Sequence, residues 1–138
     1  SYSTPGTYTA SLVVVDDSGL SSLADSVTII VQSNNVIYVA AITMTLSSTN
    51  QGYSATATVT VRNQNGTLMP NATVTGLWSG LTTGTASKTT ARNGTAAFSS
   101  TRTRNRGSFT FTVTGLSLTG YNYAPARNVA SSGSIATP

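Results

Sequence analysis

Very few side chains of this sequence can carry out acid–base or nucleophilic chemistry. The 138 residues contain no histidine, cysteine or glutamate, and the three acidic side chains are Asp16, Asp17 and Asp25. Imidazole bases, cysteine nucleophiles and cysteine–histidine zinc sites are therefore excluded. The one lysine, Lys88, has no evident partner with which to activate a serine. We therefore expect a protein that is not an enzyme and that uses no cofactor.

The adjacent carboxylates of Asp16 and Asp17 are the best candidates for metal ligands. Ca²⁺ takes about six to eight oxygen ligands, and only Asp25 follows this pair. An Asp-Asp-Ser-Gly turn explains both residues, because aspartate and glycine are typical turn formers. The sequence therefore predicts no metal site.

Two sets of side chains are spaced to bind a ligand. Tyr121 and Tyr123 would share one face of an extended segment, where two exposed rings can stack on a glycan; alternatively, they lie at the edge of the core with their hydroxyls in water. Arg102, Arg104 and Arg106 would present three guanidinium groups to an anionic polysaccharide or a phosphate. Alternatively, these arginines form a charged rim that protects an edge strand from aggregation.

Three Asn-x-Thr sequences match the pattern for N-linked glycosylation, at Asn65, Asn71 and Asn93. Asn65 and Asn93 each precede a glycine, and Asn-Gly is also the pair that tight hairpin turns favour. Turn formation is therefore a sufficient reason for two of the three, and glycosylation itself depends on the host.

The composition indicates an uncharged, hydroxyl-rich surface. Only 7% of the residues are charged, against ~25% in ordinary soluble domains, and Thr, Ser, Asn and Gly supply the remaining polarity. This surface suits an extracellular or cell-surface β-protein. The net charge of +4 reflects scarce acids more than a dense basic face, so we expect no nucleic-acid partner. No apolar run approaches the ~20 residues of a membrane span, so we expect no membrane insertion.

Residues 1–33 are predicted to form a β-hairpin. Residues 7–15 and 24–32 are strand-like, and residues 16–19 form the turn between them. The end of the first strand, residues 12–15, is apolar on both faces, as in a strand that is covered on both sides. A lone two-stranded hairpin is marginally stable in water, so this hairpin needs further strands.

Residues 34–138 are predicted to form a complete β-sandwich. Short strands with alternating side chains follow one another at intervals of about 8–12 residues, which is typical of an antiparallel immunoglobulin-like sandwich. Trp78 is either a platform for a sugar or a core residue, and its alternation with Val74 favours the core. Phe109 and Phe111 also point inward. The predicted strands are residues 36–46, 55–62, 72–79, 86–91, 95–99, 107–115 and a last one near 127–130, with a hairpin at Asn93-Gly94.

The first piece resembles a known domain family. Residues 5–9 (PGTYT), 12–19 (LVVVDDSG) and 25–29 (DSVTI) resemble the closing strands of a PKD (polycystic kidney disease) domain. The resemblance covers about residues 1–32, and the opening strands of the family have no counterpart in the sequence. It implies that the hairpin belongs to an incomplete PKD-like sandwich.

The second piece also resembles a family. Residues 59–66, 69–74 and 90–98 are similar to the bacterial Ig-like and carboxypeptidase-regulatory-like sandwiches, over about residues 36–132. Residues 76–80 and 109–114 resemble domains that follow PKD repeats in large secreted bacterial hydrolases and surface proteins. Such domains are non-catalytic, and they act as spacers, adhesive modules or substrate-docking modules.

Two hypotheses of function follow. The first is an accessory module of a large secreted or cell-surface bacterial protein such as a hydrolase, whose partners are a polysaccharide, a fibrous protein or the rest of the parent chain. The second is a structural subunit of an extracellular filament or matrix, in which copies of the chain complete one another by β-strand addition. The uncovered apolar strand of the hairpin motivates the second hypothesis.

Overall fold

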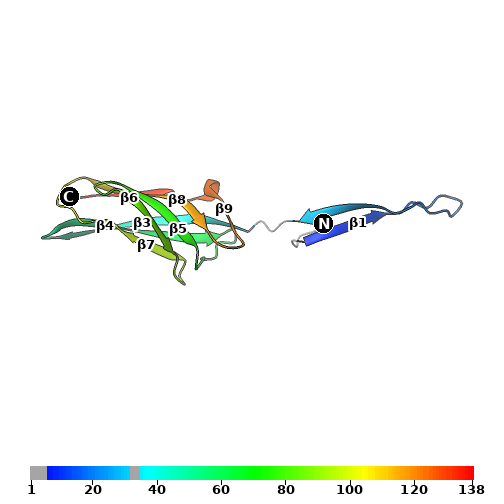
Figure 1. Cartoon of the computed structure of the whole chain (residues 1–138), viewed down its shortest axis with the longest axis horizontal. Coiled ribbons are helices and arrows are strands. Elements are labelled where there is room, and N and C mark those ends of the chain that lie inside the picture. Colours follow the sequence, from blue (N-terminus) through cyan, green and yellow to red (C-terminus); the bar gives the residue numbers. More distant parts are fainter. Residues whose placement is uncertain (1–5, 32–34) are drawn as a thin grey trace. The chain divides into compact units, whose positions relative to one another are not determined.

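The computed structural model describes residues 6–31 and 35–138, and it divides the chain into two compact units, Ser1–Asn34 and Asn35–Pro138 (Figure 1). The predicted all-β class is confirmed, since the described elements are strands and one 3₁₀ turn. Gln32, the predicted end of a strand, and the polar residues 33–34 lie outside the described residues.

The first unit is a two-stranded antiparallel hairpin of β1 (Gly6–Leu12) and β2 (Asp25–Val31), in register from Gly6 opposite Val31 to Leu12 opposite Asp25. The first strand is shorter than predicted, because residues 13–15 leave the ladder. At Val14 the backbone bonds instead to Ser22, whose Oγ accepts the Val14 N–H at 3.0 Å and whose N–H donates to the Val14 carbonyl at 2.8 Å. Beyond Leu12 the regular ladder is thus replaced by one side-chain bond, one backbone bond and an isolated bridge of Val15 with Ser21.

None of the described side chains of the hairpin is buried. Its large aliphatic side chains are mostly in water, from 48% exposed at Val13 to 95% exposed at Leu23. The exposed aliphatic residues of this unit are Leu12, Val13, Val14, Val15, Leu20, Leu23, Val27 and Ile30.

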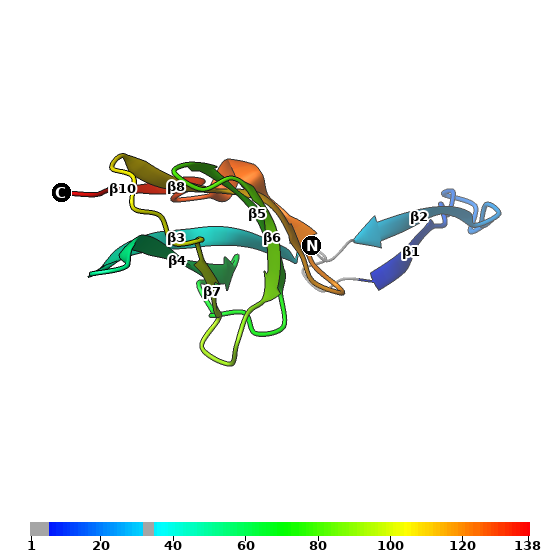
Figure 2. The same ribbon diagram turned by 60° about the vertical axis from the view of Figure 1, so that its left-hand side comes forward.

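The second unit contains two four-stranded sheets, with strand orders β10-β8-β5-β6 and β7-β4-β3-β9. Figure 2 shows the two sheets as layers that face each other. Neighbouring strands are antiparallel, except that the two-residue β9 runs parallel to β3. The elements are β3 (Val36–Thr49), β4 (Gly52–Asn63), β5 (Thr73–Gly80), β6 (Gly84–Thr89), β7 (Thr95–Ser99), β8 (Ser108–Ser117), β9 (Asn122–Tyr123), the 3₁₀ turn η1 (Pro125–Arg127) and β10 (Ser132–Ala136).

Strict alternation places the core between these sheets. In β4 the side chains of Ala55, Ala57, Val59 and Val61 are fully buried, as the period-2 pattern predicts. In β5 and β8 the inward positions are likewise the buried ones, and they include Val74, Trp78, Phe109 and Phe111. The described residues therefore form one continuous core in this unit.

Aromatic rings join the two sheets at the centre of the core. The Phe111 ring packs against Trp78 of its own sheet, with ring centroids 5.0 Å apart, and against Phe98 of the opposite sheet at 4.6 Å. Gly76 lies beside Phe111 on the neighbouring strand, and a Cβ atom at Gly76 would overlap the Phe111 ring and approach the Thr112 carbonyl oxygen at 2.9 Å. The space that Phe111 occupies therefore requires glycine at position 76.

The hairpin predicted at Asn93-Gly94 is wrong. These residues do form a turn, in which the Gly94 N–H donates to the Ala91 carbonyl at 2.9 Å. However, β6 pairs with β5, and β7 pairs with β4 in the other sheet. The reason is burial, because Ala96 and Phe98 of β7 point into the core, whereas β6 is largely exposed on both faces. The turn therefore carries the chain from one sheet to the other.

The last strand was predicted near residues 127–130, and this is also wrong, because β10 begins at Ser132. Asn128 and Val129 of the predicted segment instead bond to β3 at its bulge between Val39 and Ala41. The Asn128 side-chain oxygen accepts the Val39 N–H at 2.9 Å, and the Val129 N–H donates to the Val39 carbonyl at 2.9 Å. These bonds give the Val39 N–H and carbonyl groups their partners at the point where the regular pairing of β3 is interrupted.

We predict that Gly76→Ala lowers the free energy of unfolding by about 3 kcal/mol, because the added methyl group meets a buried ring and a backbone oxygen. Gly115→Ala is the matched control on β8, since a Cβ atom there meets nothing within 4 Å. Urea unfolding of both variants measures the difference. Equal stability of the two variants would contradict the packing described here.

Candidate functional site

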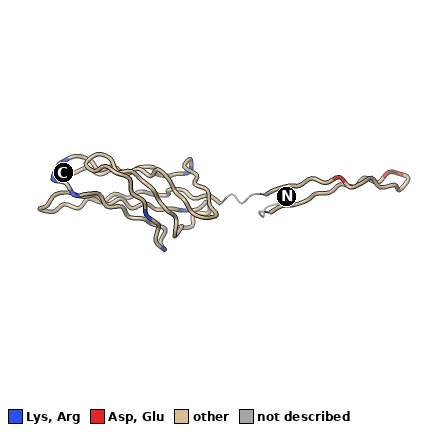
Figure 3. Tube along the Cα trace, viewed as in Figure 1, with Lys and Arg blue, Asp and Glu red and all other residues tan. Residues whose placement is uncertain are grey.

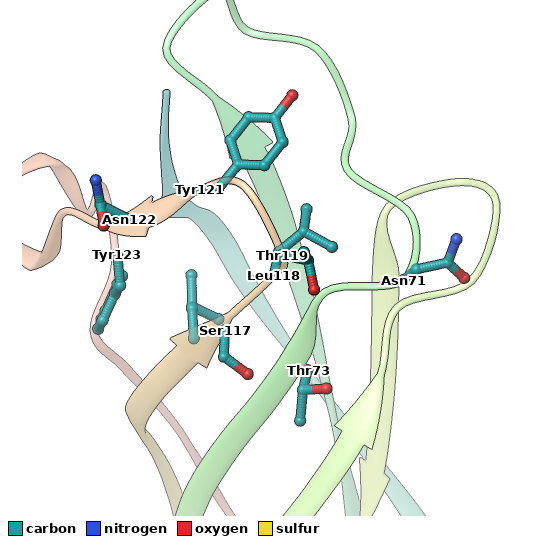
Figure 4. A pocket seen from close by; sticks show the side chains of 9 residues that line it. Asn71, Thr73, Ser117, Leu118, Thr119, Tyr121, Asn122 and Tyr123 are labelled. Atoms are coloured by element: carbon teal, nitrogen blue, oxygen red, sulfur yellow. The ribbon is translucent and has the colours of Figure 1, made fainter. Parts of the chain in front are cut away.

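A hollow of about 590 Å³ lies at the end of the second unit where β8 ends. Three segments that are distant in sequence build it: the chain just before and at the start of β5, the end of β8, and the turn into β9 (Figure 4). The lining residues are Asn71, Thr73, Leu116, Ser117, Leu118, Thr119, Tyr121, Asn122 and Tyr123.

A tight turn places Tyr121 at this hollow. Leu118 and Tyr121 form an isolated bridge, in which the Tyr121 N–H donates to the Leu118 carbonyl at 3.0 Å. Gly120 has a φ of 82°, a conformation that glycine adopts without strain. The turn brings Tyr121 back beside the end of β8, where the partly buried ring packs against the core.

The two predicted tyrosines both line the hollow, but they have different roles. The Tyr123 hydroxyl accepts a hydrogen bond from the Asn128 side-chain nitrogen at 2.7 Å, and Asn128 in turn holds the bulge of β3. Tyr123 is therefore part of the framework. The Tyr121 hydroxyl has no hydrogen-bond partner among the described residues. In Figure 4 the two rings point in different directions, so they do not form one stacking platform.

The polar side chains around Tyr121 are neutral and available. Five polar side chains other than the tyrosines line the hollow. None of these five side chains makes a hydrogen bond within residues 6–31 and 35–138, and none is charged. Hydroxyl and amide groups of this kind donate and accept hydrogen bonds but supply no acid, base or nucleophile near neutral pH. The five are Asn71, Thr73, Ser117, Thr119 and Asn122.

Asn71 is held at the rim of the hollow by its backbone. It is the only non-glycine residue in the described part of the chain with a positive φ, 61°, a conformation that asparagine tolerates. Its N–H donates to the Thr90 carbonyl at 3.0 Å. The buried Thr90 hydroxyl donates to the Met69 carbonyl at 2.6 Å and accepts the Ala72 N–H at 3.0 Å. Thr90 thus fixes the loop on both sides of Asn71.

The three predicted arginines lie at the other end of the sandwich. They belong to the connection from β7 to β8, whereas the hollow lies where β8 ends, about 30 Å further along the strand. All three side chains are exposed, and Arg102 donates to the Thr49 hydroxyl at 2.9 Å. The chain bends at Arg104 and Asn105, between Arg102 and Arg106.

Asp16 holds the turn of the hairpin. The Asp16 carboxylate accepts the N–H groups of Ser18 at 2.9 Å and Leu20 at 2.8 Å. Within the described ranges, no three His, Cys, Asp or Glu side chains come close enough to hold a metal ion.

The three asparagines of the glycosylation patterns, Asn65, Asn71 and Asn93, are all exposed.

Comparison with protein-family models, with curated proteins and with solved structures found no match. In the parts of the chain that the structure describes, no helix is long and apolar enough to span a membrane.

Sequence reasoning found the tyrosines of the hollow but missed most of its wall. In the sequence, Asn71 and Thr73 are marked only as the two ends of an Asn-x-Thr pattern, and Ser117 and Thr119 carry no signal of their own. The one available signal is Gly120, which marks a turn beside Tyr121. Bringing these residues to Asn71 requires the pairing of β5 with β8, which places Thr73 opposite Ser117.

We predict that Thr90→Val lowers the free energy of unfolding by about 2 kcal/mol, because it leaves a buried N–H and a buried carbonyl without their partner. Thr89→Val is the control, since the neighbouring Thr89 is exposed and its side chain makes no hydrogen bond in the described structure. Urea unfolding compares the two. A Thr90→Val variant as stable as the Thr89→Val variant would show that Thr90 does not hold the loop.

Proposed function

We propose that this chain is a non-catalytic module of a larger extracellular or cell-surface protein, in which an Ig-like sandwich follows the closing strands of a PKD-like sandwich. The observation that carries the proposal is the contrast between the two units. The second unit buries a continuous core, whereas the first exposes eight large aliphatic side chains, three on its two short strands and five in the connection between them.

The strand order of the second unit supports an Ig-like sandwich. Its first, second and fifth strands share one sheet, and its third, sixth and last strands share the other, as in Ig-type folds. The buried Trp78 on the third strand is also typical of such folds. The fourth strand, β6, lies beside the third, and β9 adds a short parallel pairing to β3.

The exposed surface of the hairpin supports an interrupted second sandwich. Fully burying a Val, Leu or Ile side chain stabilises a protein by about 1.5–3 kcal/mol relative to leaving it exposed. Two strands cannot supply that cover, and the described part of the hairpin leaves its aliphatic residues in water. Strands from the parent protein, packed on this hairpin as in a PKD-like sandwich, would bury them.

A module of this kind acts as a spacer or docks its parent on a polysaccharide or a fibrous protein. The neutral hydroxyl and amide groups, which greatly outnumber the charged ones, support an extracellular role. If the module has the docking role, the hollow at Tyr121 is where it would bind the polysaccharide or fibrous protein.

We predict that removal of residues 1–34 leaves the free energy of unfolding of the sandwich unchanged within about 0.5 kcal/mol, because the core that stabilises it lies in residues 35–138. The same deletion weakens the binding of a hydrophobic fluorescent dye, since it removes eight exposed large aliphatic residues and leaves only Leu68, Leu77 and Val129 exposed in the sandwich. Polar substitution of Leu20 and Leu23 in the complete chain is the matched control and weakens dye binding alone. A loss of several kcal/mol on deletion would mean that the hairpin belongs to the sandwich.

A structural subunit of a filament or matrix is the second candidate, and a separate observation favours it. All three aspartates lie in residues 1–34, whereas all seven lysines and arginines lie in residues 35–138 (Figure 3). Copies of such a chain attract one another when the hairpin of one meets the sandwich of the next. The free backbone edges of a two-stranded hairpin would add the strand pairing.

Light scattering on a sizing column, over a range of concentrations and at low and high salt, separates the two candidates. The module proposal predicts a mass of 14.1 kDa throughout. Concentration-dependent growth that high salt weakens would favour the filament and overturn the module as the main function.

A further inference from the structure

We infer that the hollow beside Tyr121 binds a neutral sugar unit of an extracellular polysaccharide. This inference rests on the docking form of the proposed function, and it assigns that function to one end of the sandwich. Four features of the hollow point to a neutral sugar: its size, its aromatic ring, its uncharged polar wall and the way its rim is held.

The size and construction of the hollow suit a small ligand. Its volume of about 590 Å³ falls within the range of ~300–1,000 Å³ that is usual for ligand sites. The wall is made by strand ends and a hydrogen-bonded turn, and Thr73 on β5 lies opposite Ser117 on β8 in the sheet register. The site is therefore formed before a ligand arrives, which lowers the entropic penalty of binding.

The aromatic ring of Tyr121 supplies an apolar surface at a fixed position. The ring packs against the core on one side and is only partly buried, so the remainder faces the hollow and solvent. A tyrosine immobilised in this way loses little conformational entropy when it makes contact. Sugar rings present patches of C–H groups that pack on such a surface, while the free Tyr121 hydroxyl remains available to a sugar hydroxyl.

The polar wall matches a ligand that carries many hydroxyl groups and no charge. Sugar hydroxyls both donate and accept, and so do the amide and hydroxyl side chains that surround Tyr121 without partners among the described residues. No carboxylate, lysine or arginine lines the hollow, so a uronate, phosphate or ammonium group would find no counter-charge there. An anionic polysaccharide would instead meet the arginines at the opposite end of the sandwich.

The rim at Asn71 is held independently of any ligand. The Asn71 N–H donates to Thr90, and the Thr90 side chain bonds to the backbone on both sides, at Met69 and Ala72. The loop therefore presents the Asn71 side chain from a fixed backbone, although the side chain itself is exposed and unpaired in the described structure. An amide presented in this way can select the orientation of a sugar hydroxyl.

The test is an array of oligosaccharides probed with the complete 138-residue chain, with neutral glucans, mannans, xylans and galactans beside uronate-containing and sulfated glycans. We expect binding to at least one neutral class, and the association constant for that glycan is then measured by calorimetry. Tyr121→Ala should weaken binding about tenfold, equivalent to one aromatic contact, whereas Tyr121→Phe should retain most of it. Tyr38→Ala, on β3 outside the hollow, is the matched control and should bind normally.

Two further variants test the hollow without changing Tyr121, which is partly buried and packs against the core. Asn71→Gly keeps the positive φ and deletes the amide, and Thr119→Asp places a charge in the hollow at an exposed position. Both should fold normally, as thermal unfolding can check, and both should weaken binding of the neutral glycan. The inference is overturned by no binding to any neutral class, by binding to anionic glycans alone, or by unchanged affinity in both variants. If the deletion of residues 1–34 behaves as predicted while glycan binding fails, the module is a spacer and only the sugar site is lost.

Discussion

The contact that the second unit depends on most is the packing of Phe111 between Trp78 and Phe98. Trp78 and Phe111 face each other on paired strands of one sheet, and Phe98 reaches them from the opposite sheet with its ring 4.6 Å from that of Phe111. The same pairing of β5 with β8, shifted by a bulge beside Gly76, continues to Thr73 opposite Ser117. The core therefore sets the register of the two strands whose far ends form the wall of the hollow, so that packing in the middle of the sandwich determines the geometry at its end.

Among the described residues of the first unit, no buried side chains pack together in this way. Its two strands make a regular ladder, but the large aliphatic side chains on and between them are exposed. The loop at Asp16 is held by local hydrogen bonds, in which the Asp16 carboxylate accepts the N–H groups of Ser18 and Leu20. Backbone pairing by itself leaves a hairpin marginally stable, since buried apolar area provides most of the stability of a β-protein. In both proposed functions a further layer covers the hairpin, and it comes from the parent protein in one and from another copy of the chain in the other.

Local patterns predicted most strands, because the alternation of apolar and polar side chains along a strand can be read directly from the sequence. The buried faces of β4 and β8 and the inward position of Trp78 follow from period-2 spacing and from composition. Pairing between distant segments could not be predicted in this way. Asn93-Gly94 looks like a hairpin turn, yet burial of Phe98 draws the next strand into the other sheet. Asn128 looks like part of a strand, yet it serves the bulge in β3. Only part of the hollow can be predicted from the sequence for the same reason, since Asn71 and Tyr121 are distant in sequence and the fold brings them to the same hollow.

Native-state hydrogen exchange on the complete chain, at a concentration where it is monomeric, tests most directly whether the sandwich supports itself while the hairpin does not. The account predicts that the amides of β4, β5 and β8 exchange only through global unfolding, because they lie beside the continuous core. It predicts that the amides of β1 and β2 exchange close to the rate of an unstructured peptide. Protection of the hairpin amides equal to that of the sandwich strands would contradict this account, and it would mean that the hairpin is stabilised within the monomer.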